Sequence, residues 1–221
     1  MAYELYECLH RRFCGHTSYD LSKPNPWVKD IILKSTPPSG RVIDLGCGLG
    51  RHLGALYNLG IEIYGLDWLD QRIKHSRQTS NSDLILADMA SLPFQDESFD
   101  TALAWRSIYF QKVEKIKHTI EEIKRVLKPG GTLICSCRSK TNTLYFVAQQ
   151  MGEEIEPDTF RLDDGIDFID ACYHFFSSEE IEEVFSGFRI ESLTELQLRH
   201  TRYTASHPEL QNNFWVFTAR K

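Results

Sequence analysis

The sequence predicts an α/β fold in which helices cover both faces of a mostly parallel sheet. Two observations support this prediction: strand-like apolar runs alternate with helix-like periodicity, and a glycine-rich loop directly follows the first strand-like run. At 221 residues the chain is long enough for one such domain with a sizeable core, or for two very small ones. We favour a single domain.

The strands are expected where short apolar runs are bounded by turn residues. These runs lie near 41–45, 61–66, 84–87, 99–104 and 131–137. Two alternating segments, 189–198 and 214–219, add strands toward the end of the chain. No internal repeat interrupts this order.

The helices are expected between these strands, at residues 51–59, 73–80 and 113–127. In the last of them, apolar residues recur at helical spacing: Ile116, Ile120, Ile123 and Leu127. Lys128 and Pro129 are expected to end that helix. A later helix should begin at the capping pattern of Ser177–Glu180.

Two segments fall outside this alternation. Residues 1–24 are expected to form an N-terminal cap segment on a main domain that spans 25–221. Residues 138–175 look irregular, and we expect an insertion over the carboxyl edge of the sheet. Long loops of this kind are usually functional lids or disordered.

The stretch 41–52 carries the strongest functional signal. Gly46, Gly48 and Gly50 allow the backbone to turn sharply and to approach a ligand closely, because no Cβ is in the way. Asp67 closes the second apolar run twenty-one positions after Gly46, the spacing expected for an acid that accepts hydrogen bonds from ribose hydroxyls. Together these features predict a nucleotide pocket.

Two details bear on the class of nucleotide. Arg51 stands where a dinucleotide fingerprint would have its third glycine, which makes an NAD-dependent dehydrogenase the weaker reading. Asp44 would oppose a pyrophosphate, but its charge would favour a ligand with an ammonium group. Taken singly, each feature also has a structural reading, since a glycine-rich turn can be a tight connection and a strand-end acid can be a helix cap.

These residues resemble the first motif of class I S-adenosylmethionine-dependent methyltransferases, and further motif-like segments follow in the family's order. They are residues 42–50, 64–67, 87–89, 98–105 and 125–136. The resemblance covers roughly residues 25–221. It implies a Rossmann-like, doubly wound, mostly parallel seven-stranded sheet with an antiparallel last strand, and S-adenosylmethionine as the cofactor. The implied activity is methyl transfer by in-line displacement, and the alternative is a protein that binds the cofactor without catalysis.

The resemblance also implies roles for single residues. Asp44 and the backbone of the loop, with Gly46, Cys47, Gly48 and Gly50, would hold the amino acid end of the cofactor. Asp67 would bind the ribose and Trp68 the adenine edge. Asp88 would accept from the adenine amino group, and the Met89 backbone N–H would contact a ring nitrogen. Trp105 would border the methionine part. For Trp68 and Trp105 the alternative is ordinary core packing.

The acceptor side resembles a bacterial group of small-molecule methyltransferases of the tellurite-resistance type. That group often has Tyr-His where this chain has Tyr109-Phe110, so a base at that position is absent. Tyr109 and His174 are the catalytic candidates, because a histidine suits general base work near neutral pH. The alternative for His174 is packing between aromatic neighbours. The resemblance implies a small-molecule acceptor.

Composition limits the partners. The chain has 25 basic and 31 acidic residues, a net charge of −6 and no basic stripe, so we expect no nucleic acid partner. It has no segment of signal-peptide or membrane-spanning character, which predicts a cytoplasmic enzyme. None of the six cysteines forms a CxxC pair, so we expect no metal site and six free thiols.

Overall fold

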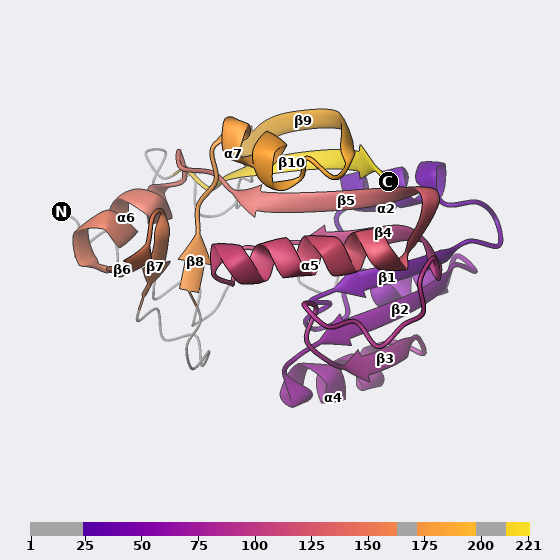
Figure 1. The fold of residues 1–221 in the computed structure, drawn as a ribbon. Coiled ribbons are helices and arrows are strands. Elements are labelled where there is room, and N and C mark those ends of the chain that lie inside the picture. Colours follow the sequence, from indigo (N-terminus) through magenta and orange to yellow (C-terminus); the bar gives the residue numbers. More distant parts are fainter. Residues whose placement is uncertain (1–23, 163–171, 198–210) are drawn as a thin grey trace.

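The computed structural model describes residues 24–162, 172–197 and 211–221. Its centre is a seven-stranded sheet in the order β3-β2-β1-β4-β5-β10-β9 (Figure 1). The strands are β1 (Arg41–Leu45), β2 (Glu62–Asp67), β3 (Asp83–Leu86), β4 (Phe99–Trp105), β5 (Leu127–Arg138), β9 (Arg189–Gln197) and β10 (Asn213–Arg220). β10 runs antiparallel to both of its neighbours, β5 and β9, and the other strand pairs of this sheet are parallel. The predicted α/β, Rossmann-like sheet with one antiparallel strand is therefore confirmed.

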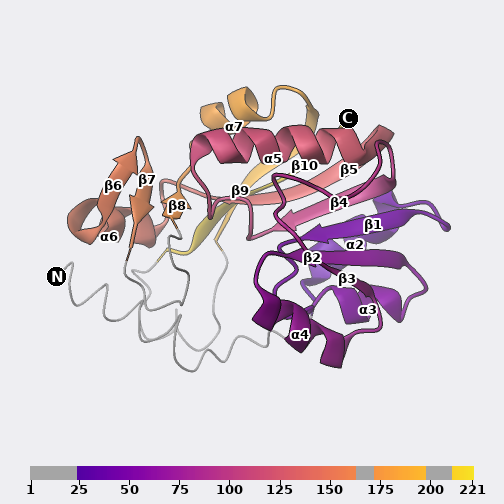
Figure 2. The ribbon, with the colours of Figure 1, turned by 60° about the horizontal axis from the view of Figure 1, so that its bottom comes forward.

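The central strands are apolar because they are covered on both faces. In β4 the side chains of Ala102, Leu103 and Ala104 are fully buried, a continuous apolar run typical of a parallel strand between two helical layers. Helix α5 (Val113–Val126) covers one face, and α2 (Pro26–Ser35) and α3 (Leu53–Tyr57) lie on the other (Figures 1 and 2). Helix α4 (Asp70–Thr79) packs beside β2 and β3.

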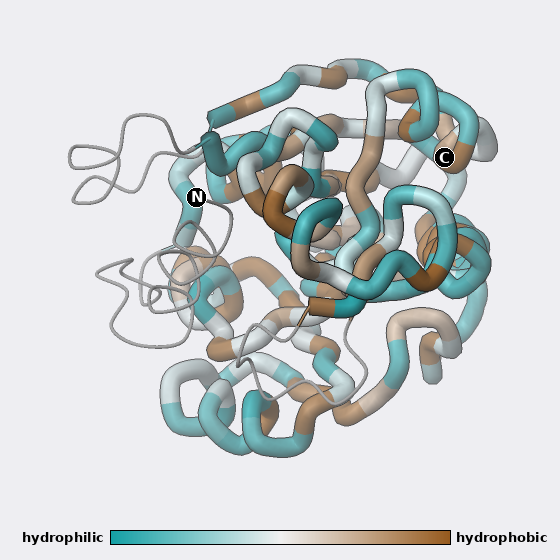
Figure 3. Tube along the Cα trace, turned by 90° about the vertical axis from the view of Figure 1, so that its left-hand side faces the viewer, coloured by the Kyte–Doolittle hydropathy of each residue, from teal (hydrophilic) through white to brown (hydrophobic). Residues whose placement is uncertain are grey.

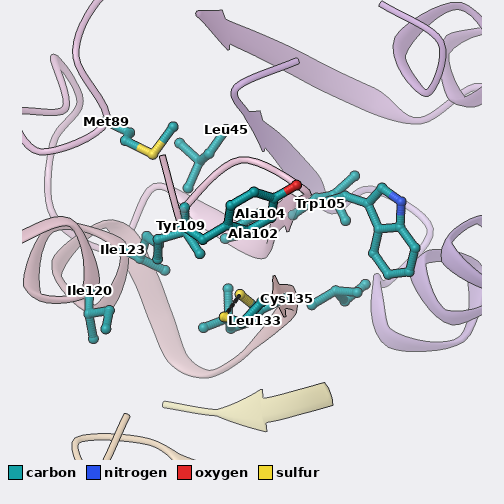
Figure 4. Close-up of a cluster of buried hydrophobic side chains, with 14 of the residues drawn as sticks. Leu45, Met89, Ala102, Ala104, Trp105, Tyr109, Ile120, Ile123, Leu133 and Cys135 are labelled. Carbon is teal, nitrogen blue, oxygen red and sulfur yellow. Dashed lines mark hydrogen bonds between the residues drawn. The ribbon is translucent and has the colours of Figure 1, made fainter. Parts of the chain in front are cut away.

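In helix α5, the spacing of apolar residues determines which face packs on the sheet. Its buried residues are Ile116, Thr119, Ile120, Ile123 and Val126. This spacing places them on one stripe that faces the sheet, while the charged residues between them face solvent. The alternation of hydrophilic and hydrophobic residues can be followed along the helices in Figure 3. Ile120 and Ile123 lie beside the interior cluster that contains Tyr109 and Cys135 (Figure 4).

The junction between α5 and β5 differs from the prediction. The helix ends at Val126 as expected, but β5 begins at Leu127 rather than near 131. Phe99 pairs with Leu127 and Thr101 with Thr132, so the strand register shifts across residues 128–131. Gly130 has a φ of +73°. The expected Pro-Gly turn therefore exists as an irregularity inside the strand, where glycine tolerates the left-handed backbone.

The expectation of an irregular insertion at 138–175 was wrong for its described part. Residues 143–162 and 172–175 contain α6 (Thr143–Met151), β6 (Glu153–Glu156), β7 (Thr159–Arg161) and β8 (Cys172–His174), and the three strands form an antiparallel sheet (Figure 2). The Asn142 side chain caps α6 by accepting from the Leu144 N–H at 3.0 Å. Residues 163–171 lie outside the described part of the chain.

Two further helix starts illustrate local rules. Helix α2, which the sequence reading did not identify, begins with Pro26 after Asn25, whose side chain accepts from the Trp27 N–H at 2.9 Å. Helix α7 (Ser178–Val184) has the predicted cap, since Ser177 accepts from the Glu180 N–H at 3.2 Å. Among the described helices, none has the length and apolar character needed to cross a bilayer.

The described cysteines, Cys47, Cys135, Cys137 and Cys172, are buried free thiols. Cys135 and Cys137 lie 3.9 Å apart at sulfur on one face of β5, as the period of a strand predicts. Cys135 is labelled in Figure 4. Cys8 and Cys14 lie outside the described residues, as does nearly all of the predicted cap segment 1–24.

Candidate functional site

The glycine loop leaves β1 and turns over the end of β2. The Gly46 and Cys47 N–H groups both donate to the Leu66 carbonyl, at 2.7 and 2.9 Å. Gly46 has a φ of +71°, and a Cβ at this position would lie 2.5 Å from the Ser107 Cβ. Only glycine fits there, because both the backbone angle and the space exclude a side chain. The loop is therefore held close to the ends of two strands.

Asp67, the last residue of β2, fastens this loop. Its carboxylate is 1% exposed and accepts from the Gly48 N–H and from the Leu69 N–H, each at 3.0 Å. Arg72 Nη1 lies 3.8 Å from the same carboxylate. A carboxylate has about four acceptor positions, and these two backbone donors occupy two of them. The predicted ribose-binding acid thus also supports the loop.

Asp88 follows β3 and faces α5. Lys115 Nζ lies 2.5 Å from Asp88 Oδ2, and the Ala90 N–H donates to Oδ1 at 2.9 Å. Partial burial would raise the pKa of the Asp88 carboxyl, but the hydrogen bonds from Lys115 and Ala90 outweigh it and lower the pKa. The group is therefore an ionised acceptor at neutral pH.

Met89 is held in place by a buried glutamine. Gln111 Nε2 lies 3.4 Å from the Met89 sulfur and donates to the Ile108 carbonyl at 3.2 Å. Thr119 of α5 donates to Gln111 Oε1 at 3.3 Å. This chain of contacts fixes Met89 beside the glycine loop, because the Met89 Cε would lie 3.3 Å from a Cβ on Gly46.

These elements enclose a cavity of about 350 Å³ at the carboxyl ends of β1, β2 and β4. Its walls are formed by Gly46, Leu66, Asp67, Trp68, Arg72, Ala87, Asp88, Met89, Arg106, Ser107, Phe110, Gln111 and Lys115. The volume lies at the lower end of the range for small-ligand pockets, roughly 300 to 1,000 Å³. The position, outside the carboxyl ends of parallel strands, is where ligands bind in open α/β sheets.

Trp68 and Trp105 occupy different environments. Trp68 is 53% exposed and lines the cavity, which is consistent with an aromatic surface for a ligand. Trp105 is buried (Figure 4), and its ring lies tilted against that of Trp27 with centroids 5.5 Å apart. It does not line the cavity, so its predicted contact with the methionine part stays a prediction.

Tyr109 and His174 lie together, and neither is among the residues that line this cavity. The His174 N–H donates to the Tyr109 carbonyl at 2.9 Å, and the Tyr109 ring is buried against Phe110 and under the Arg138 guanidinium. The His174 ring is 1% exposed, with Nδ1 2.7 Å from the Thr159 hydroxyl and Nε2 2.8 Å from Glu180. In this structure both nitrogens serve internal contacts, and the catalytic roles of these two residues stay predictions.

Asp44 is buried beneath the loop beside a histidine that the sequence reading did not single out. The Asp44 side chain is 2% exposed, and its Oδ2 lies 3.5 Å from Nδ1 of His52, which is also buried. The sequence reading also missed cavity residues that follow β4: Arg106, Ser107, Gln111 and Lys115. Their signal was their position, directly after a predicted strand of the same sheet.

Arg106 has an unusual backbone for its residue type. Its φ is +58°, its N–H donates to the Ser136 hydroxyl at 2.8 Å, and its guanidinium lies over the Phe214 ring at 5.1 Å. A left-handed conformation costs about 1 to 2 kcal/mol for a residue with a Cβ. The hydrogen bond and the ring contact hold the side chain at the cavity wall in spite of that cost.

Comparison with known proteins agrees with this geometry. Residues 43–135 match the family described as Methyltransferase domain. The chain is 27% identical to YqeM of Bacillus subtilis over 190 residues, 83% of this chain and 71% of YqeM. It is 31% identical to the tRNA (carboxymethyluridine(34)-5-O)-methyltransferase of Saccharomyces cerevisiae over 135 residues, 58% of this chain and 46% of the yeast protein. The chain thus spans less than half of that relative.

Solved structures share the fold. A crystal structure of a SAM-dependent methyltransferase from Methanosarcina mazei superposes with a TM-score of 0.73 at 21% identity, over 90% of this chain and 98% of that one. A Burkholderia thailandensis N1-methyltransferase with bound S-adenosylhomocysteine gives a TM-score of 0.65 at 16% identity, over 100% of this chain and 86% of that one. Together with the family match, this fold confirms the expected cofactor, S-adenosylmethionine.

One expectation about partners was wrong. Net charge and the absence of a basic stripe argued against a nucleic acid partner, but the relatives include tRNA methyltransferases from yeast and Arabidopsis thaliana. Net charge describes the whole surface, whereas an acceptor meets only the residues around one cavity. Arg72, Arg106 and Lys115 line that cavity in this chain.

Proposed function

We propose that this chain, which carries a methyltransferase domain at residues 43–135, transfers a methyl group from S-adenosylmethionine to an acceptor by in-line displacement. One observation carries the proposal: two strand-end carboxylates, Asp67 and Asp88, face one cavity across the glycine loop. Asp67 would accept from the ribose hydroxyls, and Asp88 is ionised and half exposed toward an adenine amino group. This is the pair of acceptors that a nucleoside requires.

The cavity also fits the amino acid end of the cofactor. The Ser107 hydroxyl is buried and has no hydrogen-bond partner among the described residues, and it lies beside Gly46, where a side chain would fill the space. Asp44 Oδ2 is likewise buried without a hydrogen bond. Buried polar atoms without partners are costly, so a ligand with ammonium and carboxylate groups supplies what these atoms lack.

The protein's contribution to catalysis would be orientation. S-adenosylmethionine supplies an activated methyl group on a sulfonium, so the chain needs to fix the nucleoside, align the acceptor behind the methyl and exclude water. Asp67, Asp88 and the loop backbone hold one end of the cofactor. Phe110 and Met89 provide an apolar wall that limits water.

The insertion is proposed to bound the acceptor side, on a domain that spans 25–221. Two contacts anchor its described part near the end of β4: Glu156 Oε1 accepts from the Val113 N–H at 2.6 Å, and His174 donates its backbone N–H to Tyr109. Both contacts place β6 and β8 next to the residues that follow β4. Segments at this edge commonly close over ligands and set specificity.

A second function, cofactor binding without catalysis, is favoured by one observation. Among the described residues that line the cavity there is no histidine, the most frequent general base, and Asp88 and Lys115, which could serve instead, are paired with each other. A soft nucleophile such as a thiolate would need no base from the protein, whereas a hydroxyl would need one. Turnover therefore decides between the two functions.

The test uses S-adenosylmethionine labelled in its methyl group. Calorimetric titration first measures cofactor binding. Unfractionated tRNA is then offered in one arm, and thiols, phenols and amines in another, with release of S-adenosylhomocysteine as the readout. Label transfer in either arm supports the enzyme and assigns the acceptor class. Tight cofactor binding with no transfer in both arms favours the non-catalytic function, and no cofactor binding refutes the proposal.

A further inference from the structure

A carboxylate and an imidazole are buried together beneath the glycine loop. Asp44 lies in β1, and His52 directly precedes α3. The side chains are 2% and 4% exposed, and Asp44 Oδ2 is 3.5 Å from His52 Nδ1. Neither Asp44 Oδ2 nor His52 Nε2 has a hydrogen-bond partner among the described residues. The pair is thus in electrostatic contact, but its polar atoms are not satisfied.

The groups around Asp44 and His52 create a negative electrostatic potential. Asp44 pairs in register with Leu103, so its side chain shares a sheet face with Trp105, which stacks on Trp27 of α2. The titratable groups nearby are the Cys47 thiol in the loop, Asp67 at the end of β2 and Arg72 of α4 beside Asp67. The pKa of the Cys47 thiol is raised, first by burial and then by the negative charges of Asp44 and Asp67.

A buried carboxylate in this setting needs a cation. Removing it from water without compensation is costly, and a positive charge within about 4 Å offsets that cost. Two cations can meet Asp44: the imidazolium of His52, which is already adjacent, and an ammonium group delivered by a ligand. One carboxylate cannot neutralise both in a dry site, so the two cations exclude each other.

We propose that His52 is a positioning residue for Asp44, and that its proton and the ammonium group of S-adenosylmethionine compete for the Asp44 carboxylate. Binding of the cofactor to the protonated pair therefore releases one proton from His52 to solvent, and the neutral imidazole then stays beside the carboxylate. This inference rests on the proposed function only in requiring that the cofactor binds at the glycine loop.

The experiment measures cofactor affinity and proton release by calorimetry in buffers of different ionisation enthalpy, from about pH 5.5 to 7.5, where the ammonium group of the cofactor stays mostly charged. The dissociation constant of S-adenosylmethionine should rise as the pH falls through this range, by at most about tenfold per pH unit, as linkage of one proton requires. Methylthioadenosine has the same nucleoside but no amino acid part. Its affinity should show no such slope.

The variant His52→Asn keeps a donor near the position of Nδ1 and cannot carry a charge, so the slope and the proton release should disappear. His52→Gln is the second variant if the first does not fold by circular dichroism. The matched control is His75→Asn, since His75 is exposed on α4 and should leave the slope unchanged.

Three results overturn the inference. They are a flat affinity in the wild type, an unchanged slope in a folded His52 variant, and an equal slope for methylthioadenosine. In each of these cases the cofactor still binds, so the proposed function stands. Failure of S-adenosylmethionine to bind at any pH overturns both the inference and the proposed function.

Discussion

The substitution Asp67→Asn tests the site most directly, because Asp67 joins the loop to the expected ribose. Asparagine has almost the same volume but only one acceptor oxygen. The carboxylate accepts from the Gly48 and Leu69 N–H groups, so the variant leaves one of these donors without its partner. An orphaned buried donor costs roughly 1 to 3 kcal/mol. The free energy of unfolding should therefore fall by about that amount.

Cofactor affinity should fall as well. Hydrogen bonds to a charged group contribute roughly 1.5 to 3 kcal/mol, so losing the charge opposite the ribose should raise the dissociation constant about 10-fold to 100-fold. Calorimetric titration with S-adenosylhomocysteine measures this change, and urea denaturation measures stability. Asp70→Asn is the control, since Asp70 is exposed three residues later and pairs with Lys74.

The 2′-deoxy analogue of the ligand isolates the ribose contact. The wild type should bind the analogue about tenfold more weakly than the parent compound, and the Asp67→Asn variant should show a clearly smaller difference, because the partner of the hydroxyl is already weakened. A folded variant that binds both ligands like the wild type would refute the ribose assignment. The effect on stability would then define Asp67 as a support for the loop alone.

Three further predictions follow from the same geometry. Gly46→Ala should lower the free energy of unfolding, measured in urea, by roughly 2 to 5 kcal/mol, because φ is +71° and the added Cβ would lie 2.5 Å from the Ser107 Cβ. Gly48→Ala should lower it by only about 1 to 2 kcal/mol, because no atom lies within 4 Å of the added Cβ. Equal losses in the two variants would contradict this explanation. Asp88→Ala should weaken cofactor binding about tenfold in a calorimetric titration. The melting temperature should change little, because the ion pair between Asp88 and Lys115 is half exposed. An unchanged affinity would show that Asp88 does not contact the cofactor. Burial would raise the pKa of Glu180, but the hydrogen bond from His174 and the charge of Lys140 outweigh burial and lower the pKa. The stability that Glu180 contributes is therefore complete above about pH 4.5, and it is lost as the pH falls through the lower pKa of the folded state. Glu180→Gln should thus be less stable than the wild type at pH 7, and the difference should shrink as the pH falls below about 4.5; a difference that stays constant would speak against the pKa shift.

Strand-end positions were readable from the sequence because they depend on local pattern. Asp44, Asp67 and Asp88 each follow a short apolar run, and parallel strands bring such ends to one edge of the sheet. That Asp67 also accepts from the Gly48 N–H was not readable, because this contact depends on the path of the loop in space. The sequence thus predicted that these strand ends lie at one edge of the sheet, but not which residues hold one another there.

The structure of the insertion and the partners of the two buried histidines could not be predicted from local sequence pattern. Asn142, which caps α6, is a local signal for a helix start, but β6, β7 and β8 have only four, three and three residues, too few for periodicity to identify them. His174 has partners fifteen residues before and six residues after it, Thr159 and Glu180, and sequence pattern does not report such pairs. The partner of His52, Asp44, lies eight residues earlier in the chain. The glycine motif predicts a ligand loop between the two residues, but it does not predict that their side chains meet.

The backbone of Arg106 has a consequence for directed evolution. At φ +58° a glycine would be relieved of strain, so selection of a library for thermal stability alone should enrich glycine at position 106. Selection for turnover should retain a side chain there, since the guanidinium forms part of the cavity wall. The two selections should therefore enrich different residues at position 106. The residue that each selection enriches would show whether stability or turnover determines the choice there.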